Sequence, residues 1–254
     1  MWSGLSFAVP YGLGARGVEL GIFCVFLTTV SLHRRIDALL GEHRALIFER
    51  HQRPRRAHAL TASSVLASFL GVCVAYAVLV DVVEPDRAAH TFGFALAAAD
   101  VGSQGLLSRS FGELTWTVTN NLGVMVGVLC LGVVFRSYGA VLVLVWNACI
   151  WVVALTTLTA RSAEAAEVGA LWFRVIAAAA LLPHLVLELS GYVLAALAGI
   201  FVSRGIFRYG WSDPVLEDIL GSSAALVMGA AVVLVLAAVV EATVPGLVLG
   251  LAGR

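Results

Sequence analysis

The stretch ALWFRVIAAAALLPHLVLELSGYVLAALAGIFVS, residues 170–203, is a long apolar run that contains Pro183, His184 and Glu188. A helix needs only about 20 apolar residues to cross a bilayer. This run therefore predicts either one tilted, kinked helix or a helix broken near Pro183, because proline cannot donate a backbone hydrogen bond. Ionisable side chains at membrane depth are costly, and by default they mark a functional or structural site that faces the protein interior.

The composition places the whole chain in the membrane class. Hydrophobic residues make up 60% of the 254 residues and charged residues only 13%, whereas a soluble domain carries about a quarter charged residues. The formal net charge is zero, which gives no argument for nucleic acid, and the partner expected from composition is the lipid bilayer.

Six apolar spans are predicted, and together they indicate an all-α, polytopic transmembrane helical bundle with its kinked or broken segment around Pro183. A turn is expected at Arg136, between the third and fourth spans. The spans are Gly17–Leu32, Ala59–Val83, Leu114–Phe135, Tyr138–Leu158, Ala170–Ser203 and Ile219–Val240.

The arginines predict the orientation and divide the chain into two parts. Residues 33–58 contain Arg34, Arg35, Arg44, Arg50, Arg53, Arg55 and Arg56. By the positive-inside rule this segment is cytoplasmic, so both termini are predicted to be extracytoplasmic. Residues 1–58 then form an N-terminal span with an arginine-rich amphipathic helix, and residues 59–254 form the transmembrane core. The amphipathic helix either anchors on anionic lipid or docks a cytoplasmic partner.

Polar side chains recur inside the later spans: Asn120, Asn121, Asn147, His184, Glu188 and Glu241. His184 and Glu188 are four residues apart, so they share one helix face. Three interpretations stay open for this intramembrane polar cluster. The residues fix helix packing, they line a polar cavity for a ligand, a lipid head group or a proton, or they hold a catalytic metal. The last is the least supported, since a hydrolytic zinc site usually needs three protein ligands, and no metal or other cofactor is expected.

Small residues recur on one face of the fifth span, where Gly191, Ala195 and Gly199 are each four residues apart. Such faces let helices approach closely. Packing within one chain is the expected use, and a homo-oligomer is the alternative.

The order of these residues over about 111–245 resembles the stage II sporulation protein M family of integral membrane proteins. The pattern is Asn120-Asn121, Gly132, Tyr138-Gly139, Asn147, Pro183-His184 with Glu188, and a last span that ends at Glu241. The resemblance implies that Asn121, Asn147, His184, Glu188 and Glu241 are core positions without an established catalytic role. It also implies a relationship to a membrane scaffold that localises peptidoglycan-remodelling enzymes during engulfment.

The expected function is therefore that of a non-enzymatic, multi-pass scaffold in the plasma membrane that assembles with other membrane or envelope proteins. One alternative is a transporter or permease subunit that uses the intramembrane polar site. A second alternative is an intramembrane metalloenzyme.

Overall fold

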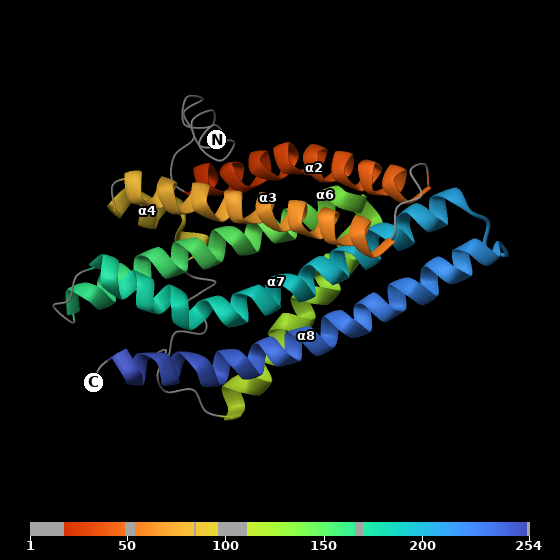
Figure 1. Cartoon of the computed structure of the whole chain (residues 1–254). Helices are drawn as coiled ribbons and strands as arrows, with labels where there is room; N and C mark the ends of the chain where they lie inside the picture. Colours follow the sequence, from red (N-terminus) through yellow and green to blue (C-terminus); the bar gives the residue numbers. More distant parts are fainter. Residues whose placement is uncertain (1–17, 49–53, 84, 96–110, 166–169, 253–254) are drawn as a thin grey trace. The chain divides into compact units, whose positions relative to one another are not determined.

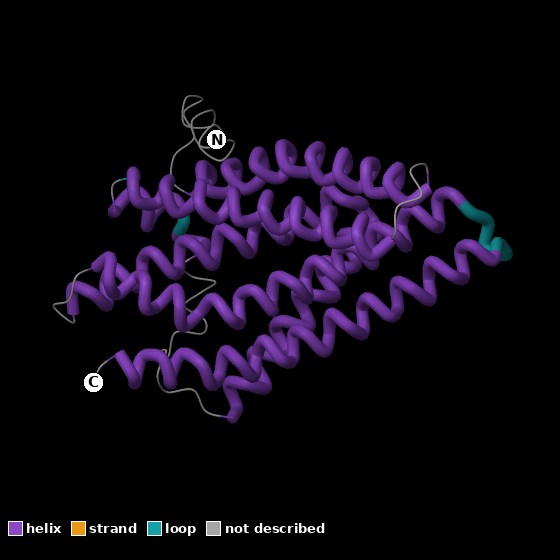
Figure 2. The backbone as a smooth tube through the Cα atoms, viewed as in Figure 1, coloured by secondary structure: helices purple, strands orange, loops and turns teal. Residues whose placement is uncertain are grey.

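The computed structural model describes residues 18–48, 54–83, 85–95, 111–165 and 170–252, and regular structure in these ranges is helical (Figures 1 and 2). The helices are α2 (Val18–Phe48), α3 (Pro54–Val82), α4 (Pro85–Thr91), α6 (Phe111–Ala165), α7 (Ala170–Arg208) and α8 (Pro214–Ala252). The prediction of an all-α fold is confirmed. The predicted extracytoplasmic termini, residues 1–17 and 253–254, lie outside the described residues.

Within the described residues, four helical segments are long and apolar enough to cross a membrane: Ser63–Val82, Leu114–Thr156, Val175–Arg208 and Pro214–Val244. They lie in α3, α6, α7 and α8. The predicted first span lies in α2, which continues without interruption into the arginine-rich segment. That span is not among the four segments, and its crossing of the bilayer stays a prediction.

The helix α6 is two helices joined at Arg136. Its apolar segment of 43 residues is about twice the length that one crossing needs. Arg136 has φ 56° and ψ −140°, which interrupts the helical backbone. Three residues later, Gly139 packs against the backbone carbonyl of Leu131, a contact that a continuous helix cannot make across eight residues. The predicted turn at Arg136 between the third and fourth spans is therefore confirmed.

The helix α7 runs through Pro183 without a break in its assignment. Its axis changes direction in its first half, the half that contains Pro183 (Figure 2). A proline removes one backbone hydrogen bond and clashes with the preceding turn, which is a sufficient cause for a kink. Of the two alternatives for residues 170–203, the structure shows the single bent helix.

The chain divides into two compact units, and the first comprises residues 1–98 and 144–153. In this unit α2 and α3 run side by side in opposite directions (Figure 1), and Arg35 Nε donates a hydrogen bond to Ser68 Oγ at 3.1 Å. The arginine-rich part of α2 therefore packs against α3, and Ile36 and Leu40 in this part of α2 are buried.

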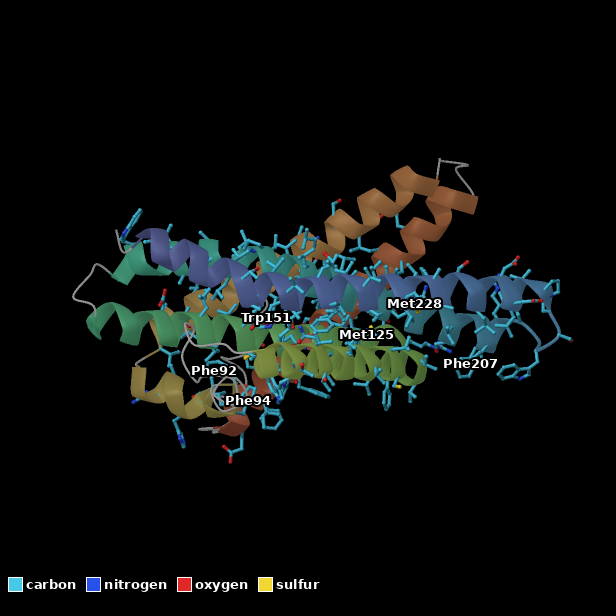
Figure 3. All side chains as sticks on the ribbon, turned by 90° about the horizontal axis from the view of Figure 1, so that it is seen from below. Phe92, Phe94, Met125, Trp151, Phe207 and Met228 are labelled. Atoms are coloured by element: carbon cyan, nitrogen blue, oxygen red, sulfur yellow. The ribbon has the colours of Figure 1, made fainter. Side chains whose placement is uncertain are left out.

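Aromatic rings from α3, from the segment that follows α4 and from α6 pack together in the first unit. Tyr76 and Phe92 are fully buried, and their ring centroids are 6.3 Å apart in an edge-to-face arrangement. Phe94 lies beside Phe92 (Figure 3) and packs on Trp146, with ring centroids 4.8 Å apart. Aromatic pairs in these geometries each contribute about 0.5–1.5 kcal/mol beyond their buried area.

The second unit comprises residues 99–143 and 154–254, and α7 and α8 form its antiparallel hairpin (Figure 1). The turn between them ends at Asp213, whose side chain accepts a hydrogen bond from the Val215 amide at 2.9 Å. Asp213 thus caps α8, and Pro214 occupies the first helical position, where its missing N–H has no consequence.

The small-residue face of α7 packs within the chain. A Cβ placed on Gly199 would lie 2.6 Å from the carbonyl oxygen of Leu129 and 3.1 Å from the Cα of Gly132, both in α6. A Cβ on Gly191 would meet the side chain of Leu234 in α8. The expected intramolecular use of this face is confirmed at both glycines, and only residues without a side chain allow these close approaches.

The backbone at Arg136 generates a first prediction. Arg136→Gly and Arg136→Ala both remove the guanidinium group, but only glycine adopts this positive φ without strain. The glycine variant should be about 1–2 kcal/mol more stable than the alanine variant, measured by denaturant unfolding in one detergent. Equal stabilities would show that the turn does not constrain this residue.

The glycine contact between α6 and α7 generates a second prediction. Gly199→Ala should lower the free energy of unfolding by about 1–3 kcal/mol, because the two helices must separate to admit the methyl group. Gly127→Ala in α6 is the matched control, since a Cβ there meets nothing within 4 Å. Unfolding titrations that give the same stability for both variants would contradict the close packing.

Candidate functional site

The centre of the candidate site is a hydrogen bond between Tyr192 and Glu188 of α7. Tyr192 Oη donates to Glu188 Oε1 at 2.7 Å. Tyr192 is fully buried, and Glu188 exposes 7% of its surface. The two residues are four apart, so one helical turn places both on the same face. The phenol gives the buried carboxylate the donor that it needs in an apolar interior.

His184 lies one turn before Glu188 on the same helix and exposes 7% of its surface. The face predicted from the His184–Glu188 spacing is therefore an inward-facing one in the folded chain. It continues for a further turn to Tyr192, a residue that the sequence analysis did not single out. The available signal was the repeated spacing of four residues from His184 through Glu188 to Tyr192.

The helix α6 contributes the two neighbouring asparagines. Asn121 is buried, and its Oδ1 lies 3.5 Å from Tyr192 Oη. A phenol has one proton, so Tyr192 gives it to Glu188 in the shorter bond, and the contact with Asn121 is weak. Asn120 Nδ2 lies 3.4 Å from Asn121 Oδ1, and the side chain of Asn120 is exposed. Only Asn121 of this pair therefore belongs to the interior.

The helix α8 contributes Glu241, which is half-buried. It lies within range of an electrostatic interaction with Glu188 and Tyr192. The polar cluster thus draws on three helices of the second unit, with Asn121 from α6, Glu188 and Tyr192 from α7, and Glu241 from α8.

Asn147 is the one predicted cluster residue that belongs to the first unit. It is half-buried and follows Trp146, which takes part in the aromatic packing of that unit. Its assignment to the intramembrane polar cluster therefore stays a prediction from the sequence.

The chemistry available to the cluster is hydrogen bonding and charge. Among the described residues no group of three or more His, Cys, Asp or Glu side chains is arranged to hold a metal ion. A hydrolytic zinc site usually requires three protein ligands, and the metalloenzyme alternative stays an untested alternative. The groups in contact are the phenol of Tyr192, the carboxyl group of Glu188 and the amide of Asn121, and the contact with Asn121 joins α7 to α6.

Comparison with known proteins identifies one family. The family model described as Stage II sporulation protein M matches residues 62–245. The match begins within α3, further toward the N-terminus than the resemblance over about 111–245, and it includes every residue of the predicted polar cluster. The helix α2 lies before it. Neither the curated proteins nor the solved structures give a match.

The Tyr192–Glu188 hydrogen bond generates a third prediction. Tyr192→Phe removes the donor and should lower the free energy of unfolding by about 1.5–3 kcal/mol, the range for a bond to a charged group. In a Glu188→Gln background the same change should cost about 1 kcal/mol less, because the acceptor is then neutral. Unfolding titrations of the four proteins measure this coupling.

Tyr209→Phe is the control for this cycle, since Tyr209 lies in the turn after α7 and its hydroxyl has no partner among the described residues. Its stability should change by less than about 0.5 kcal/mol. If Tyr192→Phe cost the same in both backgrounds, the bond would not be what stabilises this face of α7.

Proposed function

The chain belongs to the stage II sporulation protein M family, and from this premise we propose that it is a non-catalytic, multi-pass membrane scaffold that assembles with partner proteins. The process proposed for it is remodelling of the envelope or of the membrane. The proposed site of action is the plasma membrane, with residues 33–58 in the cytoplasm and both termini outside.

The proposal rests on the contacts that the polar side chains of the second unit make with one another. Glu188 accepts a hydrogen bond from Tyr192 on its own helix. Tyr192 also lies beside Asn121 of α6. Glu241 of α8 lies within range of an electrostatic interaction with Glu188 and Tyr192. Polar contacts between helices in a bilayer specify which helices pack together. This use supports a packing role for the cluster and requires no bound reactant.

The distribution of apolar sequence gives further support. The described residues lie almost entirely in helices, and four helical segments are suited to crossing a membrane. A scaffold of this kind contributes a shaped membrane surface, and the enzymatic work is done by the proteins that bind it. The segment 33–58, with its seven arginines, is the proposed place for a cytoplasmic partner.

The test is recovery of a partner from native membranes. The tagged full chain is extracted in mild detergent, and co-purifying proteins are quantified against a tagged multi-pass protein of similar size. We expect one or more proteins in constant ratio to the chain. A variant in which Arg34 and Arg35 are both changed to glutamine tests the cytoplasmic segment and should lose any partner bound there.

Recovery of the chain alone, together with solute flux into liposomes that Glu188→Gln abolishes, would overturn the scaffold proposal in favour of a permease. Recovery of a second copy of the chain without other proteins would restrict the assembly to a homo-oligomer.

A further inference from the structure

The end of the second unit where α7 meets α8 carries exposed aromatic side chains. The apolar segment of α7 ends at Arg208, and that of α8 begins at Pro214. The short turn between them therefore lies where lipid gives way to water. Phe207 is 72% exposed and Trp211 is 81% exposed, and Phe207 is found at this end of the hairpin in Figure 3. Large aromatic side chains are enriched at this depth of a bilayer.

Two arginines lie against aromatic rings at the same place. The guanidinium carbon of Arg136 is 4.9 Å from the centroid of the Phe207 ring. The guanidinium carbon of Arg208 is 5.9 Å from the centroid of the Tyr209 ring. Both distances fall within the range of a cation–π interaction. Arg136 comes from the turn inside α6 and Arg208 from the end of α7, so distant parts of the sequence supply the two charges.

Acidic residues also occur at this end: Asp213 lies in the turn, and Glu217 and Asp218 lie in the first turns of α8. Among the described residues neither Arg136 nor Arg208 forms an ion pair. Asp213 uses its side chain to cap α8. Glu217 lies in the first turn of α8, where the positive end of the helix dipole stabilises an acidic side chain.

A guanidinium group that rests on a ring still has donors at its edge. Arginine has five N–H donors in a planar fork that matches phosphate geometry, and the ring occupies only its face. We propose that Arg136 and Arg208 bind the phosphate of an anionic phospholipid headgroup at the turn between α7 and α8. Phe207 and Trp211 lie beside the acyl chains of that lipid. The positive charge of the two arginines favours an anionic headgroup over a neutral one. The exposed rings favour a lipid over a soluble anion, because they can pack against acyl chains.

The experiment titrates a short-chain phosphatidylglycerol onto the purified full chain in neutral detergent. The shift of the thermal unfolding midpoint gives the apparent affinity, and native mass spectrometry counts the bound lipid. Phosphatidylcholine with the same chains tests the headgroup charge. Inorganic phosphate tests whether the acyl chains are needed.

Arg136→Gln and Arg208→Gln should each weaken phosphatidylglycerol binding by about five-fold, the effect of one arginine near a membrane surface. Arg208 lies in the regular last turn of α7, so its variant remains informative even if the change at Arg136 disturbs folding. The matched control is Arg87→Gln, at an exposed arginine of α4 outside the arginine-rich segment, which should leave the affinity unchanged.

An equal loss in the Arg87 variant would mean that net charge, and not a site, attracts the lipid. An unchanged affinity in both the Arg136 and Arg208 variants would also overturn the proposal. So would stabilisation by inorganic phosphate that equals stabilisation by phosphatidylglycerol.

Discussion

The constraint on which the structure depends is that an apolar environment offers no partner to a backbone polar group. The described chain meets it by forming helices, whose backbone bonds are internal. Once those bonds are made, lipid is as apolar as leucine, and association between helices must come from close packing and polar contacts. In the second unit the close packing is the approach of Gly199 to Gly132 and Leu129. The polar contact between helices is that of Tyr192 in α7 with Asn121 in α6, whose Oη and Oδ1 atoms lie 3.5 Å apart.

Arg136 takes part both in the turn between the two halves of α6 and in a contact at the end of the hairpin formed by α7 and α8. Its positive φ reverses the chain inside α6, and Gly139 completes the turn against Leu131. A non-glycine residue in this conformation is strained, and the contact of its guanidinium group with Phe207 offsets part of the strain. The same residue therefore makes the turn between two spans and presents a positive charge at the end of the hairpin.

The polar cluster and the end of the hairpin formed by α7 and α8 differ in their surroundings. The cluster lies in the interior, where Tyr192 and Glu188 bond to each other and each side chain that would be costly alone has a neighbour. The end of the hairpin formed by α7 and α8 is exposed, and Arg136 and Arg208 lie there against aromatic rings.

The sequence by itself determined the all-helical membrane class, the turn at Arg136 and the shared face of His184 and Glu188. These follow from the length of apolar runs and from the helical period, which are local properties of the chain. It also predicted that Glu241 belongs with these residues, through their order in the family pattern.

Only the tertiary structure showed which helix lies opposite each helix face. The helical period shows that a residue faces inward but does not name the helix opposite it. The structure therefore added Tyr192 to the cluster, separated buried Asn121 from exposed Asn120, and placed Asn147 in the other unit. It also paired the arginine-rich part of α2 with α3, because helices separated by a short connection fold back on each other and bury their apolar faces.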